Sequence, residues 1–484
     1  MIPRILYLLP LLFASCTASS TPHSAQQAAP VDTISYTIDT KQLCQHWEGW
    51  GVSLCWWAGQ CGNWDDEKID EIISWLVSPE GLNYSHFRYN IGGGDDPENR
   101  NCELHHMGKG KGLRAEMEGF KDFTGDKYHW ERDEAQRKIM LKIREKRPDA
   151  VFEAFSNSCP YCMTYSGCVG GNADGYKDNL KPEYYEEFAH YLVDVCKHYK
   201  DKYGIEFKTL EPFNESATGY WYQNGSQEGC HFDYQSQIDF LRVLAPILRK
   251  SGLKTIISAS DETCTEQSIE AFKAYQEAGV LPLVGQWNTH TYDANDEQRT
   301  QLSHLTRQAG IPFWMSETGS GGRGLGGNLR LSQRLFDDVR VMQPEAWLDW
   351  QYIEEGSDQW CTVRSNFQRQ TYRKVKNFYV RQQCTRFIKR GYDIVETPCP
   401  QSLAAISPDC DTLTLVLLNE GEETMHNIRI NNSKFKIQKS KVFRTSLSED
   451  LASISDALSE NDNTLSVILP KQSITTLVIP IRRR

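Results

Sequence analysis

Between about residues 47 and 352, short apolar runs alternate with segments of helical periodicity. Residues 67–76 carry isoleucine and leucine at spacings of three and four, which indicates an amphipathic helix. The same periodicity recurs at residues 183–202, 234–250 and, more weakly, 331–342. Eight runs are typical of buried strands: residues 47–54, 86–91, 151–156, 207–213, 255–260, 286–291, 312–316 and 346–351. Eight strands that alternate with helices over about 300 residues predict an α/β fold, the (β/α)8 TIM barrel.

A doubly wound open sheet is the alternative arrangement for the same alternation. Such a sheet usually has a glycine-rich phosphate-binding turn after its first strand. Here the first run contains Gly49-Trp50-Gly51 and lacks the third glycine of that turn. The barrel is therefore the favoured interpretation.

The pattern changes beyond about residue 365, where short alternating runs are broken by Asn, Asp, Gly and Pro. These runs are residues 393–406, 412–418, 426–430, 434–444, 464–469 and 474–479. They predict a C-terminal β-sandwich. Residues 33–40 alternate in the same way ahead of the barrel, so we expect an N-terminal strand to complete the sandwich. The expected domains are a strand segment at 33–46, the barrel at 47–364 and the sandwich at 365–484.

The first sixteen residues have the features of an export signal. Arg4 precedes an apolar run of ten residues, which is too short to span a hydrocarbon core of about 30 Å. The run ends in small residues before Cys16 and resembles a bacterial lipobox, in which the cysteine is lipidated. Phe13 stands where leucine is usual, so ordinary secretory cleavage nearby stays open. We expect a signal peptide at 1–16, a flexible tether at 17–32, and an outer-membrane or cell-surface lipoprotein, or otherwise a periplasmic or secreted protein.

The chain of 484 residues has 53 basic and 64 acidic side chains, a net charge of −11. This balance argues against nucleic acid as a partner, because nucleic-acid-binding proteins usually present a basic face. Aromatic residues make up 11% of the chain, which is compatible with stacking on sugars. Cys159, Cys162 and Cys168 lack the second Cys-x-x-Cys that a zinc site would need. We expect no metal and no cofactor, and membrane contact only through an N-terminal lipid.

Two glutamates stand where apolar strands meet loops. Glu215 follows the fourth predicted strand and Glu317 follows the seventh. They lie 102 residues apart, about three βα units, and functional residues of barrels gather at the C-terminal ends of strands. A single strand-end glutamate is more often paired with a nearby Arg or Lys, but two in matching positions can share one substrate bond. One would protonate the leaving oxygen while the other attacks the anomeric carbon or activates a water.

In these features the chain resembles glycoside hydrolase family 30, whose members are retaining barrel enzymes with an attached β-sandwich. Five motifs occur in the family order: Gly49-Trp50-Gly51, Arg88-Tyr89-Asn90-Ile91-Gly92-Gly93-Gly94, Asn214-Glu215, Ser316-Glu317 and Lys471-Gln472-Ser473-Ile474-Thr475-Thr476. The resemblance implies that Glu215 is the general acid/base and Glu317 the nucleophile. A retaining enzyme should hold these two carboxyl groups about 5–5.5 Å apart.

The same resemblance implies residues that support the two carboxylates. Arg88 ends the second strand, and a bidentate contact with Glu317 would hold that carboxylate charged. A structural ion pair is the alternative role for Arg88. Asn214 would hydrogen-bond the sugar 2-hydroxyl, and Tyr292 would hydrogen-bond the nucleophile.

Other candidates near the strand ends have open roles. His290 is a candidate binding residue or a structural histidine, and Trp350 is a candidate sugar contact or a core residue. Asn157 is a further expected sugar contact. Asp261 and Glu262 close the fifth strand and either reach the substrate or pair structurally. One or two of five tryptophans at predicted loops or strand ends are expected to form sugar platforms: Trp56, Trp57, Trp64, Trp221 and Trp360.

The subgroup depends on the loop after the third strand. Residues 156–164 resemble the Ser-Pro-Pro-Tyr-Trp-Met run of endo-β-1,6-galactanase-like members, as does Gln227-Glu228-Gly229-Cys230. Cys159 and Cys162 stand where that group has Pro and Trp. We therefore expect a retaining β-glycoside hydrolase of extracellular glycan that is endo-β-1,6-galactanase-like, with β-1,6-glucanase, xylanase and exo-β-glycosidase activities as alternatives. A non-catalytic glycan-binding lipoprotein and a metal-dependent barrel hydrolase are the alternatives of other classes.

Overall fold

The computed structural model describes residues 32–483 apart from residues 95, 97–116, 124, 126, 224, 432–434, 456–457 and 462. The predicted signal peptide at 1–16 and lipidation site Cys16 lie outside the described residues, as does almost all of the tether. None of the helices in the described part of the chain has the length and apolarity needed to cross a membrane.

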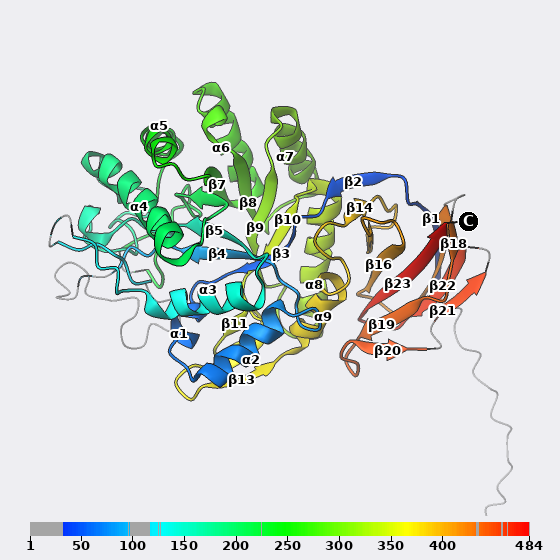
Figure 1. The fold of residues 1–484 in the computed structure, drawn as a ribbon. Helices are drawn as coiled ribbons and strands as arrows, with labels where there is room; N and C mark the ends of the chain where they lie inside the picture. Colours follow the sequence, from blue (N-terminus) through cyan, green and yellow to red (C-terminus); the bar gives the residue numbers. More distant parts are fainter. Residues whose placement is uncertain are drawn as a thin grey trace, which may run out of the picture.

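Eight parallel strands close into a barrel (Figure 1). They are β3 (Gly49–Ser53), β4 (His86–Asn90), β5 (Val151–Phe155), β6 (Thr209–Glu211), β7 (Ile256–Cys264), β8 (Gln286–Asp293), β9 (Phe313–Thr318) and β10 (Ala346–Asp349). Each overlaps one of the predicted runs, and β7, β8 and β9 continue two to four residues beyond the predicted ends. β10 pairs with both β9 and β3, which closes the ring and leaves no open edge. The predicted TIM barrel is confirmed.

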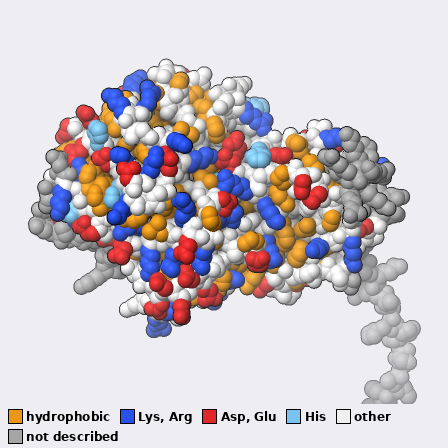
Figure 2. All heavy atoms as spheres, in the orientation of Figure 1, with side chains coloured by type: hydrophobic (Ala, Val, Ile, Leu, Met, Phe, Trp, Pro, Cys, Tyr) orange, Lys and Arg blue, Asp and Glu red, His pale blue; other side chains and the backbone are white. Residues whose placement is uncertain are grey.

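Helices cover the outside of the barrel: α1 (Trp57–Cys61), α2 (Asp66–Val77), α3 (Glu134–Lys146), α4 (Tyr185–Tyr203), α5 (Tyr234–Lys250), α6 (Thr265–Glu277), α7 (Asp296–Ala309) and α8 (Gly324–Asp337). The bounds of α5 are those that the periodicity predicts. α8 begins before the predicted Leu331 because its first turn is rich in glycine, which hides the apolar period. Its predicted end at Met342 is a separate π-helical turn, Asp338–Met342. Basic and acidic side chains are interspersed over this face of the barrel (Figure 2).

Two further sheets form the predicted sandwich. The first contains β1 (Asp32–Asp39), β17 (Thr424–Asn431), β22 (Thr464–Leu469) and β21 (Leu458–Asn461). The second contains β2 (Leu43–His46), β14 (Asp393–Val395), β15 (Ser402–Ile406), β16 (Thr412–Asn419), β23 (Ser473–Arg483), β19 (Lys441–Thr445) and β20 (Ala452–Ile454), with β18 (Phe435–Ile437) paired to β23. β1 runs parallel to β17, so the N-terminal strand completes the sandwich as predicted.

A small sheet and a helix join the two parts. The sheet contains β11 (Ile353–Glu354), β12 (Val363–Asn366) and β13 (Thr371–Lys374), and the helix is α9 (Lys376–Thr385). The domain boundary predicted after residue 364 falls inside β12. Gln383 of α9 is fully buried, donates to Thr445 Oγ1 at 2.9 Å and accepts from Thr476 Oγ1 at 2.6 Å. The sandwich is therefore fixed to the barrel through buried hydrogen bonds.

The stability of the sandwich should depend on its N-terminal strand. Ile38 of β1 is fully buried in the sandwich core, whereas Ile34 on the same face of β1 is 39% exposed. We expect Ile38→Ala to lower the free energy of unfolding by about 2–5 kcal/mol. The matched Ile34→Ala should cost about 0.5 kcal/mol or less. Urea unfolding measures both changes, and equal costs would show that β1 is not part of the core.

Candidate active site

The two predicted catalytic carboxylates meet at the C-terminal end of the barrel. Glu215 lies in the loop after β6, and Glu317 is the penultimate residue of strand β9. A carboxylate oxygen of Glu215 and one of Glu317 lie within 4.8 Å of each other. Inverting enzymes need about 6.5–9.5 Å between carboxyl groups to admit a water, whereas retaining enzymes have about 5–5.5 Å. The close approach suits direct attack on the sugar by one carboxylate.

The backbone around Glu215 has an uncommon conformation. Glu215 has φ +50°, and Asp261, which faces it, has φ +59°. The Glu215 amide donates to the Asp261 carbonyl at 2.8 Å, so the two left-handed residues hold each other in place. Such conformations cluster at functional sites, where the surrounding structure imposes them.

Arg88 is fully buried beneath the pair and is surrounded by carboxylates. Its Nε donates to Glu153 Oε1 at 2.9 Å, its Nη1 donates to Glu317 Oε2 at 3.1 Å, and its Nη2 contacts Asp261. The predicted bidentate contact with Glu317 is wrong, because the other guanidinium nitrogens are occupied by Glu153 and Asp261. The barrel register explains the arrangement, since Arg88 on β4 pairs directly with Glu153 on β5.

His290 is a second buried cation between the carboxylates. Its Nδ1 lies 3.1 Å from Glu215 Oε1 and 3.8 Å from Glu317 Oε1, and its Nε2 lies 3.2 Å from Asp261 Oδ1. Burial alone would lower the pKa of His290, but these carboxylates raise it to about 10. The same two cations, Arg88 and His290, hold the pKa of Asp261 at about 2 against the effect of burial. His290 therefore places a positive charge between the carboxylates of Glu215 and Glu317.

One group of side chains in the described part of the chain is close enough to bracket a metal ion: Glu215, His290 and Glu317. A protonated imidazole has two N–H donors and no lone pair for a metal. With a pKa of about 10, His290 supplies the positive charge that a cation would otherwise bring. The group is thus suited to holding and transferring protons.

Glu317 is held by two donors of different kinds. Tyr292 Oη donates to Glu317 Oε1 at 3.0 Å, and Arg88 donates to the other oxygen. Burial raises the pKa of Glu317 to about 7, while His290 and Arg88 oppose the rise and Glu215 adds to it. In the hydrogen bonds that the structure shows, Arg88 touches Glu317 and not Glu215, which favours the ionised form at the predicted nucleophile.

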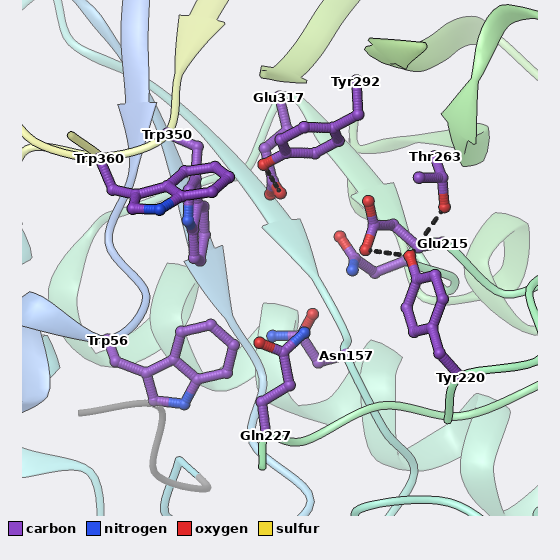
Figure 3. Close-up of a pocket in the computed structure, with 11 residues that line it drawn as sticks. Trp56, Asn157, Glu215, Tyr220, Gln227, Thr263, Tyr292, Glu317, Trp350 and Trp360 are labelled. Atoms are coloured by element: carbon purple, nitrogen blue, oxygen red, sulfur yellow. Dashed lines mark hydrogen bonds between the residues drawn. The ribbon is translucent and has the colours of Figure 1, made fainter. Parts of the chain in front are cut away.

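The pair opens into a cavity of about 260 Å³ (Figure 3). Its lining combines carboxylates, amides and aromatic rings: Trp56, Asn157, Asn214, Glu215, Tyr220, Gln227, Thr263, Tyr292, Glu317, Trp350 and Trp360. An amphipathic lining of this kind fits a sugar, which has apolar C–H faces and a polar rim.

Three tryptophans form one side of this cavity. The rings of Trp56 and Trp350 meet edge to face with centroids 5.5 Å apart, and Trp360 lies beside Tyr292 at 6.4 Å. Figure 3 shows the three indoles gathered opposite Tyr220 and Thr263. Trp56 and Trp360 are thus the two loop tryptophans that reach the cavity. The other three candidates are absent from its lining: Trp57, Trp64 and Trp221.

The two expected amide contacts line the cavity as well. Asn214 Oδ1 is buried and has no hydrogen-bond partner among the described residues, so it is free to accept from a bound hydroxyl. Asn157 Nδ2 donates to Cys55 Sγ at 3.4 Å, and the Asn157 backbone N–H donates to Asn90 Oδ1 at 3.1 Å. Both side chains therefore present polar atoms at the cavity wall.

Asp261 and Glu262 are buried and absent from the cavity lining. Asp261 belongs to the Arg88–His290 network, and Glu262 accepts from the Ala217 amide at 3.0 Å and from Gln237 at 2.9 Å. His290 also lies behind the cavity and touches the pair rather than the open space. These three residues therefore do not line the cavity, and their contacts are those of the structural alternatives given above.

Four residues of the site were not predicted. Glu153 is a central partner of Arg88, and Tyr220 and Thr263 line the cavity beside Glu215. Gln227, noted only for its likeness to the galactanase-like group, lines the cavity too. Tyr220 lies in the same loop as Glu215, shortly after it in the sequence, and this proximity could have marked it as a candidate. Glu153 sits within an apolar strand and gives no such signal until the register is known.

Cys159 and Cys162, the departures from the galactanase-like pattern, are not among the cavity-lining residues. Cys159 is fully buried, and Cys162 is partly buried. The cavity lining is therefore built without these two positions.

Comparisons with known proteins agree with this geometry. A sequence profile described as O-glycosyl hydrolase family 30 matches residues 33–278. An endo-β-1,6-galactanase of Hypocrea rufa is 30% identical over 409 residues, 82% of this chain and 83% of that protein. An exo-β-1,6-galactobiohydrolase of Bifidobacterium longum subsp. longum is 23% identical over 424 residues, 68% of this chain and 28% of that protein. A conserved exported protein from Bacteroides fragilis has a similar structure, with a TM-score of 0.77 and 20% identity, over 91% of this chain and 99% of that chain.

The fold and the carboxylate pair define an O-glycosyl hydrolase. The chain belongs to glycoside hydrolase family 30, and its motifs predicted that family correctly.

The environment of Glu317 predicts the pH dependence of the enzyme. The nucleophile attacks only when ionised, so kcat/KM should fall as the pH drops through the Glu317 pKa of about 7. Tyr292→Phe removes a hydrogen bond to the ionised form and should move this acid limb to higher pH. Tyr165→Phe removes a hydroxyl outside the cavity and should leave the limb in place. A limb near the ordinary glutamate value of about 4.3 would contradict the account.

Proposed function

We propose that the chain is a retaining endo-β-1,6-galactanase that cleaves extracellular galactan. The observation that carries the chemistry is the close Glu215–Glu317 pair, with Arg88 and His290 buried behind it. The substrate is supported by the similarity to the Hypocrea rufa endo-β-1,6-galactanase over most of both chains. We assign catalysis to the barrel at 47–364, with residues 33–46 and 365–484 forming the supporting sandwich.

In the first step, an oxygen of Glu317 attacks the anomeric carbon while Glu215 gives a proton to the departing glycosidic oxygen. The C–O bond to the leaving sugar breaks, and a covalent glycosyl ester forms on Glu317. In the second step, Glu215 takes a proton from water, and the resulting hydroxyl attacks the same carbon. Glu317 leaves as a carboxylate, and the sugar keeps its original anomeric configuration.

The buried cations serve both steps. Arg88 and Tyr292 stabilise the Glu317 carboxylate before attack and again as it departs. His290 Nδ1 lies within hydrogen-bond distance of Glu215, the group that changes protonation state twice. Asn214 would bind the 2-hydroxyl of the sugar, and Trp350 would pack against its ring, because both line the cavity beside the pair.

An exo-acting enzyme of the same family is the second candidate, since a relative with 23% identity is an exo-β-1,6-galactobiohydrolase. β-1,6-Glucan and xylan are further substrate candidates within the family. A purely glycan-binding role has less support, because both carboxylates and their cationic partners are present.

The product profile tests the proposed substrate. Purified protein is incubated with β-1,6-galactan, β-1,6-glucan, xylan and aryl β-glycosides. We expect a ladder of galacto-oligosaccharides from β-1,6-galactan alone, and its loss in Glu317→Ala. A single disaccharide product from the start of the reaction would identify exo action instead. Turnover of glucan or xylan in preference to galactan would overturn the proposed substrate.

Azide rescue tests the two catalytic roles separately. Glu317→Ala and Glu215→Ala should each retain the fold and lose at least about 10²-fold in kcat on galactan. With an activated aryl galactoside, azide should attack Glu317→Ala directly and yield the α-galactosyl azide. In Glu215→Ala, azide should attack the covalent intermediate and yield the β-galactosyl azide. The opposite anomers would mean that the two roles are exchanged.

We also propose that the protein is exported and anchored by a lipid on Cys16, with residues 17–32 as the tether. A similar structure belongs to a conserved exported protein, and the first sixteen residues have the order of a lipoprotein signal. Cys16→Ala should release the protein from the membrane fraction, while Cys44→Ala should not. Membrane association that survives in Cys16→Ala would overturn the lipid anchor.

A further inference from the structure

The exposed aromatic side chains of the described residues gather at one end of the barrel. Ten large apolar side chains are exposed, and five of them are aromatic. All five come from the loops that follow β4, β5 and β6: Phe123, Tyr165, Tyr176, Tyr220 and Tyr222. The aliphatic ones lie on sandwich segments or at the start of β7. Loops that follow parallel strands lie at the face that carries the cavity, so this bias is tied to the active site.

Three of these tyrosines come from two loops that contact each other, and we call them the tyrosine strip: Tyr176, Tyr220 and Tyr222. The ring of Tyr176 lies directly on Gly219, where an added Cβ would come within 2.1 Å of it. Gly219 precedes Tyr220, so the Tyr176 ring packs on the backbone directly before Tyr220. Tyr222 is bridged to Asn172 in the loop that carries Tyr176, with a hydrogen bond from the Gln223 amide to the Asn172 carbonyl at 2.8 Å.

A buried tryptophan supports the strip from below. Trp221 lies between Tyr220 and Tyr222 in sequence and is 2% exposed, while its neighbours are 42% and 47% exposed. Its Nε1 donates to the Glu215 carbonyl at 2.8 Å, and its ring lies against Gly229. Trp221 therefore anchors the loop after β6 to Glu215. Its burial fixes the backbone on either side, so that Tyr220 and Tyr222 keep their positions while they remain exposed.

Tyr220 connects the strip with the cavity. Its hydroxyl donates to Glu215 Oε2 at 2.6 Å and lies 2.9 Å from Thr263 Oγ1, while part of its ring stays exposed. Figure 3 places Tyr220 beside Glu215, on the side of the cavity opposite the three tryptophans. Since Glu215 gives its proton to the leaving oxygen, the strip lies on the leaving-group side.

We propose that the tyrosine strip binds the sugar units of an uncharged galactan chain that extend beyond the bond being cleaved. This inference rests on the proposed function and adds an extended leaving-group site to it. The exposed rings carry no charge at neutral pH and offer apolar faces to the C–H faces of pyranose rings. Their continuity with the cavity through Tyr220 argues for the substrate chain as the occupant.

The strip should make the enzyme favour long chains. The test compares kcat/KM on a β-1,6-galactan polymer with kcat/KM on an aryl β-galactoside that ends at the cleaved bond. In Tyr176→Ala/Tyr222→Ala, the ratio of the polymer value to the short-substrate value should fall about tenfold. Tyr176→Phe/Tyr222→Phe should restore the ratio, because stacking needs the ring and not the hydroxyl.

Tyr165→Ala is the matched control, since Tyr165 is 56% exposed on the same β5 loop and lies outside the strip. It should keep the wild-type ratio. An equal fall on both substrates would show that the loop only positions Glu215 and would overturn the strip. An unchanged ratio in an active double variant would overturn the role of the tyrosine strip and leave the proposed function standing. A wild-type enzyme that does not cleave galactan would overturn both the role of the strip and the proposed function. Dimerisation lost in the double variant would assign the strip to a second copy of the chain instead.

Discussion

The burial of Arg88 beneath the active site is the interaction on which the rest of the site depends. A guanidinium removed from water is stable only if carboxylates surround it. Glu153, Asp261 and Glu317 supply that charge, and their strands hold them at fixed positions around the barrel. The arrangement leaves Glu317 as the one member of this cluster that also faces the cavity. The position of Glu317 between this buried cation and the cavity is thus a consequence of how the barrel is packed.

His290 extends this network from the nucleophile to the acid/base. Its ring bridges Asp261 on one side and the catalytic pair on the other, and its position follows from the pairing of His290 with Glu317 across β8 and β9. The two carboxylates therefore share a permanent positive neighbour while their own protons move. The three tryptophans and Tyr220 lie on opposite sides of the cavity into which this pair opens.

The sequence allowed the barrel, the sandwich and the meeting of the two glutamates to be predicted because each depends on a local pattern. Apolar runs mark the strands, and Glu215 and Glu317 stand at the ends of two of them. The partners of Arg88 could not be predicted, because they depend on the register between β4 and β5 and on the side chain of Asp261. The prediction of a bidentate contact between Arg88 and Glu317 was wrong for this reason. Tyr220 and Thr263 come from loops whose course no periodicity describes.

Trapping the covalent intermediate would identify the nucleophile of the enzyme. A 2-deoxy-2-fluoro-β-galactosyl fluoride reacts at the nucleophile and slows hydrolysis of the glycosyl ester, so the labelled residue can be identified by peptide mass spectrometry. The account predicts one fluorogalactosyl group on the peptide that contains Glu317, and no label in Glu317→Ala. A label on Glu215 or on any other residue would contradict the assignment of the nucleophile and with it the role of Arg88.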